Sequence, residues 1–176
     1  MRTLYSIEVW FTKSRIFVTL QAKVELVEHN EVELAWAAGF FDGEGHIRIA
    51  KHSKRGSYML NISAVQSTPE PIELLQKLFG GTAHKRVMPY RGALKAMFTW
   101  QASSKLAEGI LMEMLPYLVV KRDEAELALE FRRTFRPQFG DRSKNPPELE
   151  DRRRAMMLDL QQMRKDKREQ HLPIAA

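Results

Sequence analysis

Stretches with helical spacing of apolar residues alternate along the chain with stretches in which apolar and polar residues alternate strictly. A helix is predicted over 30–45, because Asn30 and Glu33 form a capping-box pattern and no charge occurs from 34 to 41. Strict alternation predicts strands at 46–52 and 58–66, and again at 82–90 and 93–102. Helices are predicted at 70–79, 105–115 and 122–135. The predicted order is therefore helix, two strands, helix, two strands and two helices.

Each predicted strand has one apolar face and one polar face. The apolar positions, which we expect to be buried, are Ile47, Ile49, Leu60, Ile62, Ala64, Leu94, Ala96, Phe98 and Trp100. Four such strands predict an α+β fold, in which a four-stranded antiparallel sheet packs under the helices and leaves its other face exposed.

The end of the first helix breaks a local rule. The helix dipole is negative at this end and favours cations, yet Asp42 and Glu44 lie here between Gly43 and Gly45. Two carboxylates in such a place indicate a divalent cation bound through oxygen. The alternative is a buried helix with a glycine cap and solvated acids.

Length and composition favour one domain with appendages. The chain has 176 residues, no cysteine, and no apolar run long enough to span a membrane. We therefore expect a soluble, intracellular protein without disulfides or thiolate metal sites. Residues 1–29 are predicted to be an N-terminal extension, either a hairpin or loosely ordered. Residues 30–136 are predicted to form the core, and 137–176 a polar linker followed by a C-terminal helix with charges that are solvated or contact phosphate.

The positive charge is concentrated in the middle of the chain. The net charge is +6, but residues 45–122 hold twelve Lys or Arg against four Asp or Glu, a net charge of +8. The polar sheet face carries no acid, which favours nucleic acid over an ordinary solvated face of mixed charge. The predicted contact positions on this face and its turns are His46, Arg48, Ala50, His52, Lys54, Arg55, Ser57, Met59, Asn61, Ser63, Thr82, His84, Arg86, Met88, Arg91, Lys95, Met97 and Thr99.

The run AAGFFDGEG at 37–45 resembles the LAGLIDADG motif of homing endonucleases. The matching residues are Ala38, Gly39, Asp42, Gly43 and Gly45, with Glu44 in place of the second Asp. The order of elements from 31 to 135 is similar to the αββαββα core of that family, with its saddle-shaped sheet. Both extensions fall outside the resemblance.

The resemblance implies roles for several residues. Glu44 would bind the catalytic Mg²⁺, for which Mn²⁺ can substitute, with the carbonyl group of Gly43 nearby. Gln66 and Lys121 stand at the places where similar proteins complete the catalytic site, whereas a further basic helper has no counterpart. Because the chain has one motif, it would form a homodimer through Ala35, Ala38, Gly39 and Asp42, although Asp42 also fits a cap or turn group.

The expected function is site-specific, metal-dependent cleavage of double-stranded DNA at a long pseudo-palindromic target, leaving short 3′ overhangs. Two alternatives use the same fold: an intron maturase that binds RNA, and a DNA-binding regulator that has lost cleavage. The presence of Glu44, Gln66 and Lys121 argues against the regulator, because a protein that only binds does not need an acid aimed at phosphate.

Overall fold

The computed structural model describes residues 29–51, 57–90, 93–135 and 146–170. Residues 1–28 of the predicted hairpin lie outside the described residues, as do the start of the predicted linker and the candidate contacts His52, Lys54, Arg55 and Arg91. The elements are α1 (Glu31–Glu44), β1 (Gly45–Lys51), β2 (Tyr58–Gln66), α2 (Glu70–Phe79), β3 (Thr82–Tyr90), β4 (Ala93–Ser103), α3 (Ser104–Met114), the 3-10 helix η1 (Leu115–Tyr117), α4 (Arg122–Arg133) and α5 (Pro147–Gln170).

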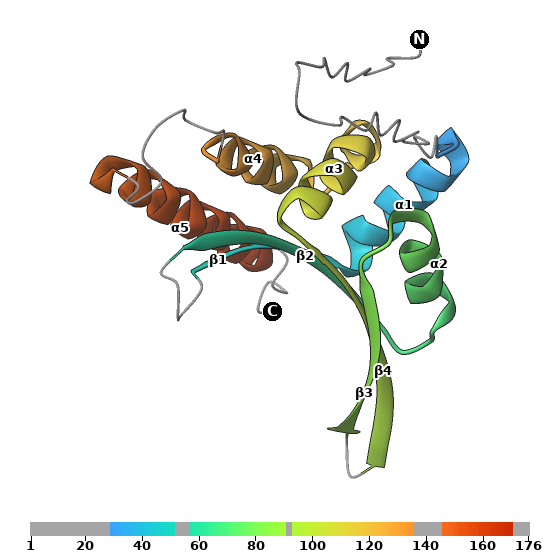
Figure 1. Ribbon diagram of the computed structural model, residues 1–176. Coiled ribbons are helices and arrows are strands. Elements are labelled where there is room, and N and C mark those ends of the chain that lie inside the picture. The colour runs from blue at the N-terminus through green and yellow to red at the C-terminus, as the bar shows by residue number, and fades with distance from the viewer. Residues whose placement is uncertain (1–28, 52–56, 91–92, 136–145, 171–176) are drawn as a thin grey trace, which may run out of the picture.

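The four strands form one antiparallel sheet in the order β1-β2-β4-β3. Figure 1 shows the helices gathered on one side of this curved sheet. The predicted α+β fold is therefore confirmed, with five α-helices among the described residues.

Local sequence explains where the elements begin and end. The Asn30 side chain accepts a hydrogen bond from the Glu33 backbone N–H at 2.8 Å, and the Glu33 carboxylate accepts one from the Asn30 N–H at 3.4 Å, which completes the capping box of α1. At the end of α2, Gly80 and Gly81 have φ angles of 71° and 84°, which glycine adopts without strain. The Gly80 carbonyl then accepts the indole N–H of Trp100 at 2.8 Å, so this turn is tied to β4.

The core lies between the sheet and the helices, and the predicted alternation holds in β1 and β2. Ile47, Leu60 and Ile62 are all 0% exposed. In β4 the prediction is correct for Trp100, which is 0% exposed, but wrong for Leu94, which is 76% exposed. The cause is visible in Figure 1, where the far end of the β3–β4 hairpin extends beyond the helices.

Helix α5 packs against α4 and β1. Met156 and Leu160 are buried in the main core, and Arg153 is buried with them at 2% exposure. The Arg153 guanidinium donates to the hydroxyl and carbonyl oxygens of Thr134 at 3.0 and 2.9 Å. Within the described residues, none of the helices combines the length and apolar character that a membrane span requires.

Candidate active site

The candidate site begins where α1 passes directly into β1. Glu44 is the last residue of α1 and is exposed, and Gly45 opens the strand. A Cβ atom at Gly45 would collide with the backbone oxygen and ring of Phe41, so glycine is required for this tight junction. The junction therefore presents the Glu44 carboxylate at the edge of the polar sheet face.

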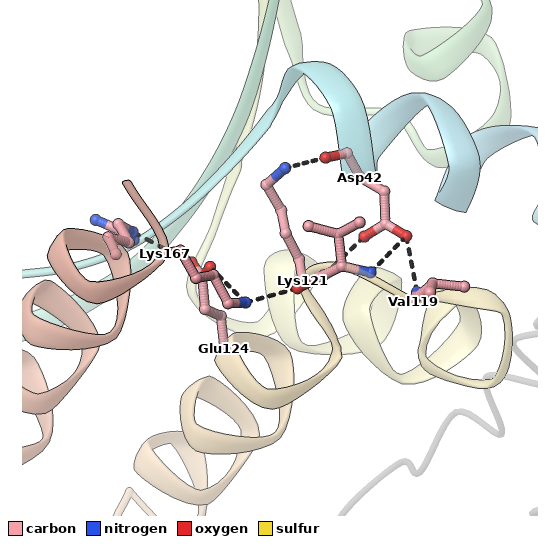
Figure 2. Close-up of polar contacts among 7 residues, drawn as sticks. Asp42, Val119, Lys121, Glu124 and Lys167 are labelled. Atoms are coloured by element: carbon pink, nitrogen blue, oxygen red, sulfur yellow. Dashed lines mark hydrogen bonds and ion pairs between the residues drawn. The ribbon is translucent and has the colours of Figure 1, made fainter. Parts of the chain in front are cut away.

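Asp42 caps another helix, as Figure 2 shows. Its carboxylate accepts hydrogen bonds from the backbone N–H groups of Val119, Val120 and Lys121 at 2.7, 3.1 and 2.9 Å. These groups lie just before α4, so the acid that is unfavourable at the negative end of α1 is favourable at the positive end of α4. The interpretation of Asp42 as a cap agrees with these bonds, which direct its carboxylate into its own protomer.

The same contact brings Lys121 to the end of α1. The Lys121 ammonium group donates a hydrogen bond to the backbone carbonyl of Asp42. Burial lowers the pKa of Lys121, and the nearby carboxylates of Glu124, Asp42 and Glu44 oppose this effect. A half-buried ammonium group close to Glu44 is suited to stabilise charge on a phosphate.

Gln66 lies at the same end of the sheet. The register pairs Ala64 of β2 with Gly45, so Gln66 is two residues beyond the point where α1 ends. The side-chain oxygen Oε1 of Gln66 accepts hydrogen bonds from the backbone N–H and the hydroxyl group of Ser67 at 2.7 and 3.2 Å. The register thus places Gln66 at the end of β2 beside the start of β1, while Glu44 and Lys121 lie at the C-terminal end of α1.

The strand register places the predicted contact residues side by side on the polar sheet face. The directly opposed pairs are His46 with Ser63, Arg48 with Asn61, Ala50 with Met59, His84 with Thr99, and Arg86 with Met97, while Thr82 pairs with Gln101 and Ser63 also pairs with Gln101. The four strands contain no Asp or Glu. Ser57 precedes β2, and the backbones of Met88 and Lys95 pair in the β3–β4 hairpin. This face is therefore basic and polar along its described length.

His46 lies on this face near the end of α5. Its pKa is lowered, chiefly by burial, and the cations Arg164, Arg48 and Arg168 add to the effect while Glu124 opposes it. A neutral imidazole at this edge can accept or donate a hydrogen bond without adding charge.

The predicted dimer residues fall on two sides of α1. Ala35 and Gly39 are exposed, whereas Ala38 is 0% exposed and packs inside the protomer, so it does not belong to the outer face. The exposed face also includes Val32 and Trp36, which sequence reasoning did not single out.

Sequence reasoning also missed a cluster of charged residues behind Lys121. Glu124 is 4% exposed, and its carboxylate is paired with Arg164 and Lys167 of α5 at 3.2 and 3.3 Å. The charge run of the C-terminal helix indicated that the helix is basic, but it did not indicate which of its cationic side chains contact the protein interior.

Glu44 is suited to a hard divalent cation, although the described residues of one protomer contain no group of three or more acidic or histidine side chains that could hold a metal. Mg²⁺ is typically bound by one or two carboxylates together with water and substrate phosphate. The exposed Glu44 carboxylate and the Gly43 carbonyl at the helix end fit such an incomplete site, which substrate would complete.

Comparisons with known proteins support the fold. No family model matches the chain. DNA endonuclease I-CvuI from Chlorella vulgaris is 33% identical over an alignment of 111 residues, which covers 58% of this chain and 65% of the relative, so the chain spans slightly less than two thirds of that protein. The solved structure of the homing endonuclease I-CvuI, in complex with its target in the presence of Ca, matches with a TM-score of 0.51 and 22% identity over 73% of this chain and 94% of the other. The meganuclease I-SmaMI, bound to uncleavable DNA, matches with a TM-score of 0.54 and 20% identity over 77% and 46%.

The chain has the α+β fold that the solved homing endonucleases share. More particularly, its sequence is similar to that of the homing endonuclease I-CvuI, and the resemblance carried by its AAGFFDGEG run is confirmed.

Proposed function

We propose that this protein is a homodimeric, site-specific endonuclease that hydrolyses double-stranded DNA with a divalent metal ion, with Mg²⁺ as the natural ion and Mn²⁺ as a substitute. The observation that carries the proposal is the junction of α1 and β1, where the exposed Glu44 lies beside a sheet face without acids and the Lys121 ammonium group is bonded to the Asp42 carbonyl, with Gln66 at the nearby end of β2. The relative I-CvuI is a DNA endonuclease, which supports the same substrate for this chain.

Each residue of the site has a distinct task in this proposal. Glu44 and the Gly43 carbonyl hold the metal ion, which when bound activates water and stabilises the leaving oxygen. Lys121, fixed by its bond to the Asp42 carbonyl, stabilises the negative charge on the attacked phosphate. Gln66 orients the water through its side-chain NH₂ group, while its side-chain oxygen Oε1 remains bonded to Ser67.

The polar sheet face binds the DNA in this proposal. Arg48 and Arg86 are exposed, and arginine can bind guanine with two hydrogen bonds in the major groove. The curved sheet follows the groove on one side of the cleavage site, and the minor groove there faces Glu44. Two protomers would cover the two halves of a pseudo-palindromic target and cut one strand each, leaving short 3′ overhangs.

The outer face of α1 supports the homodimer. Gly39 and Gly43 are exposed in this face, and a Cβ added to either would meet nothing within 4 Å. Glycine in a helix interior costs about 1 kcal/mol relative to alanine, and the protomer alone offers no reason for that cost. A second α1 packed closely across Gly39, with Val32 (79% exposed) buried beside it, supplies the reason. It also brings the two Glu44 carboxylates near the twofold axis.

Selection of cleaved targets from a randomised palindromic DNA library, with and without Mg²⁺, tests the proposal. We expect a defined target to be cut only with the metal ion. Glu44→Gln is expected to abolish cleavage while retaining binding to the same target, whereas Glu73→Gln, an exposed acid in α2, leaves cleavage unchanged. Cleavage by the Glu44→Gln variant would show that the catalytic assignment is wrong. Binding without any cleavage by the wild type would favour the regulator, and preferential binding of structured intron RNA would favour the maturase.

A further inference from the structure

Helix α5 contacts the backbone that carries Lys121. The Lys167 ammonium group donates a hydrogen bond to the carbonyl of Val120 at 2.6 Å, and a second to Glu124 at 3.3 Å (Figure 2). Val120 precedes Lys121 directly, and Glu124 lies in the first turn of the helix that follows. A side chain of the C-terminal helix is therefore bonded on both sides of Lys121.

The segment 119–121 depends on these polar contacts for its position. The side chains of Val119 and Val120 are 82% and 56% exposed, so apolar packing does not fix them. Asp42 holds the N–H groups of the segment from the side of α1, and Lys167 holds the Val120 carbonyl from the side of α5. With both contacts present, the peptide groups that lead into Lys121 have partners on opposite sides.

Burial of Glu124 strengthens the link between α5 and this segment. A buried carboxylate needs cationic partners to offset the loss of hydration, and Glu124 finds two of them, both on α5. The same carboxylate is the principal charge that favours the protonated form of Lys121. Glu124 therefore joins the position of α5 to the charge of the candidate catalytic lysine.

We infer that Lys167, together with Glu124, is a positioning residue for Lys121, and that the C-terminal helix is a working part of the active site. Lys167 acts through the Val120 carbonyl and does not contact substrate. The effect of Lys167 on cleavage rests on the proposed function, in which Lys121 stabilises the attacked phosphate. The effect of Lys167 on the position of the 119–121 segment is independent of the proposed function.

The kinetic test compares Lys167→Met with Lys165→Met. Lys165 is an exposed lysine of the same helix that makes no hydrogen bond or ion pair with another described residue. Its replacement by Met changes the net charge of the protein by the same amount as Lys167→Met. We expect Lys167→Met to lower the single-turnover cleavage rate about tenfold, with little change in the Kd for target DNA in Ca²⁺. Lys165→Met should leave both unchanged, and Lys167→Arg should restore the rate. An unchanged rate in Lys167→Met overturns the inference.

A double-mutant cycle separates positioning from direct contact with phosphate. If Lys167 acts through Lys121, then Lys167→Met has no further effect on the rate when Lys121 is already Met. If Lys167 itself binds phosphate, the two losses multiply and DNA binding also weakens, which overturns the positioning role. Should Lys167→Met fail to fold, Lys167→Gln takes its place, because its amide can still donate to Glu124.

Amide hydrogen exchange in the free protein gives an answer that needs no cleavage. We expect the amides of Val119, Val120 and Lys121 to exchange about tenfold faster in Lys167→Met than in the wild type, and at the wild-type rate in Lys165→Met. Unchanged exchange overturns the inference. If the wild type cuts no target but exchange increases as expected, then the proposed function fails while the positioning of this segment stands.

Discussion

Removal of the Asp42 carboxylate tests the contact between α1 and α4 on which the candidate site depends. In Asp42→Ala, three backbone N–H groups lose their acceptor at once, namely those of Val119, Val120 and Lys121. The backbone carbonyl of residue 42, which accepts from the Lys121 side chain, is retained. The variant therefore separates the cap from the lysine contact.

The expected loss of stability follows from the exposure of the three donors. A hydrogen bond to a charged group contributes about 1.5 to 3 kcal/mol where the remaining partner stays buried. Val119 and Val120 are largely exposed, so water can replace the carboxylate there and each contributes about 0.5 to 1 kcal/mol. Lys121 is half-buried, so water replaces less of the hydrogen bond that its N–H group loses. Asp42→Ala should thus lower the free energy of unfolding by about 2 to 4 kcal/mol, or Tm by about 4 to 16 °C for a chain of this size.

Urea unfolding, followed by circular dichroism, measures this loss, and all variants are compared at one fixed protein concentration because the stability of a dimer depends on it. Asp159→Ala is the matched control, because Asp159 is an exposed acid of α5. Asp42→Asn, which keeps an acceptor oxygen but not the charge, should fall between the wild type and Asp42→Ala. A loss below about 0.5 kcal/mol in Asp42→Ala, within the range of an ordinary surface substitution, would refute the assignment of Asp42 as the cap of α4.

Three further predictions address the sheet, the dimer and pH. Arg48→Ala should weaken target binding by about 1 to 3 kcal/mol and relax base preference; fluorescence anisotropy with variant targets checks this, and unchanged preference contradicts it. Gly39→Leu should yield monomers in sedimentation, whereas Gly109→Leu, at an equally open glycine of α3, should not. Although burial favours a neutral ring, the pKa of His29 is raised by a backbone hydrogen bond and the Glu113 carboxylate. Its stabilisation is therefore complete below pH 6.5 and lost as pH rises through the higher folded pKa, and His29→Gln should flatten that part of the unfolding profile.

Periodicity predicted the faces of the strands but not how far the helices cover them. In β1 and β2 the alternating apolar positions are buried, because several helices pack on this part of the sheet. In β4 the same alternation continues to Leu94, which is 76% exposed. A period of two tells which side chains share a face, but burial depends on what lies opposite, and that is a property of the whole fold.

The candidate site was predictable where a motif carried it and unpredictable where tertiary contacts made it. Glu44, Gln66 and Lys121 were predicted from their places relative to the AAGFFDGEG run. The bonds of Asp42 to a segment 77 to 79 residues away could not be read from local pattern. The pairing of Lys167 with Glu124 was equally hidden, because one lysine among many in a charged helix has no distinguishing mark in sequence.

The spacing of the two acids in α1 explains how one helix end serves two purposes. Residues two apart in an α-helix point in directions about 200° apart, so Asp42 and Glu44 cannot share a face. Because Asp42 turns toward the 119–121 segment, Glu44 must turn outward, where it is exposed at the edge of the sheet. The unfavourable position of Asp42 at the negative end of the α1 dipole is thus explained by its favourable position at the positive end of the α4 dipole. Of these two acids, Glu44 is the one that caps no helix among the described residues. In the proposed site, the cap and the metal ligand therefore depend on one orientation of α1, since a rotation of the helix about its axis would move both carboxylates together.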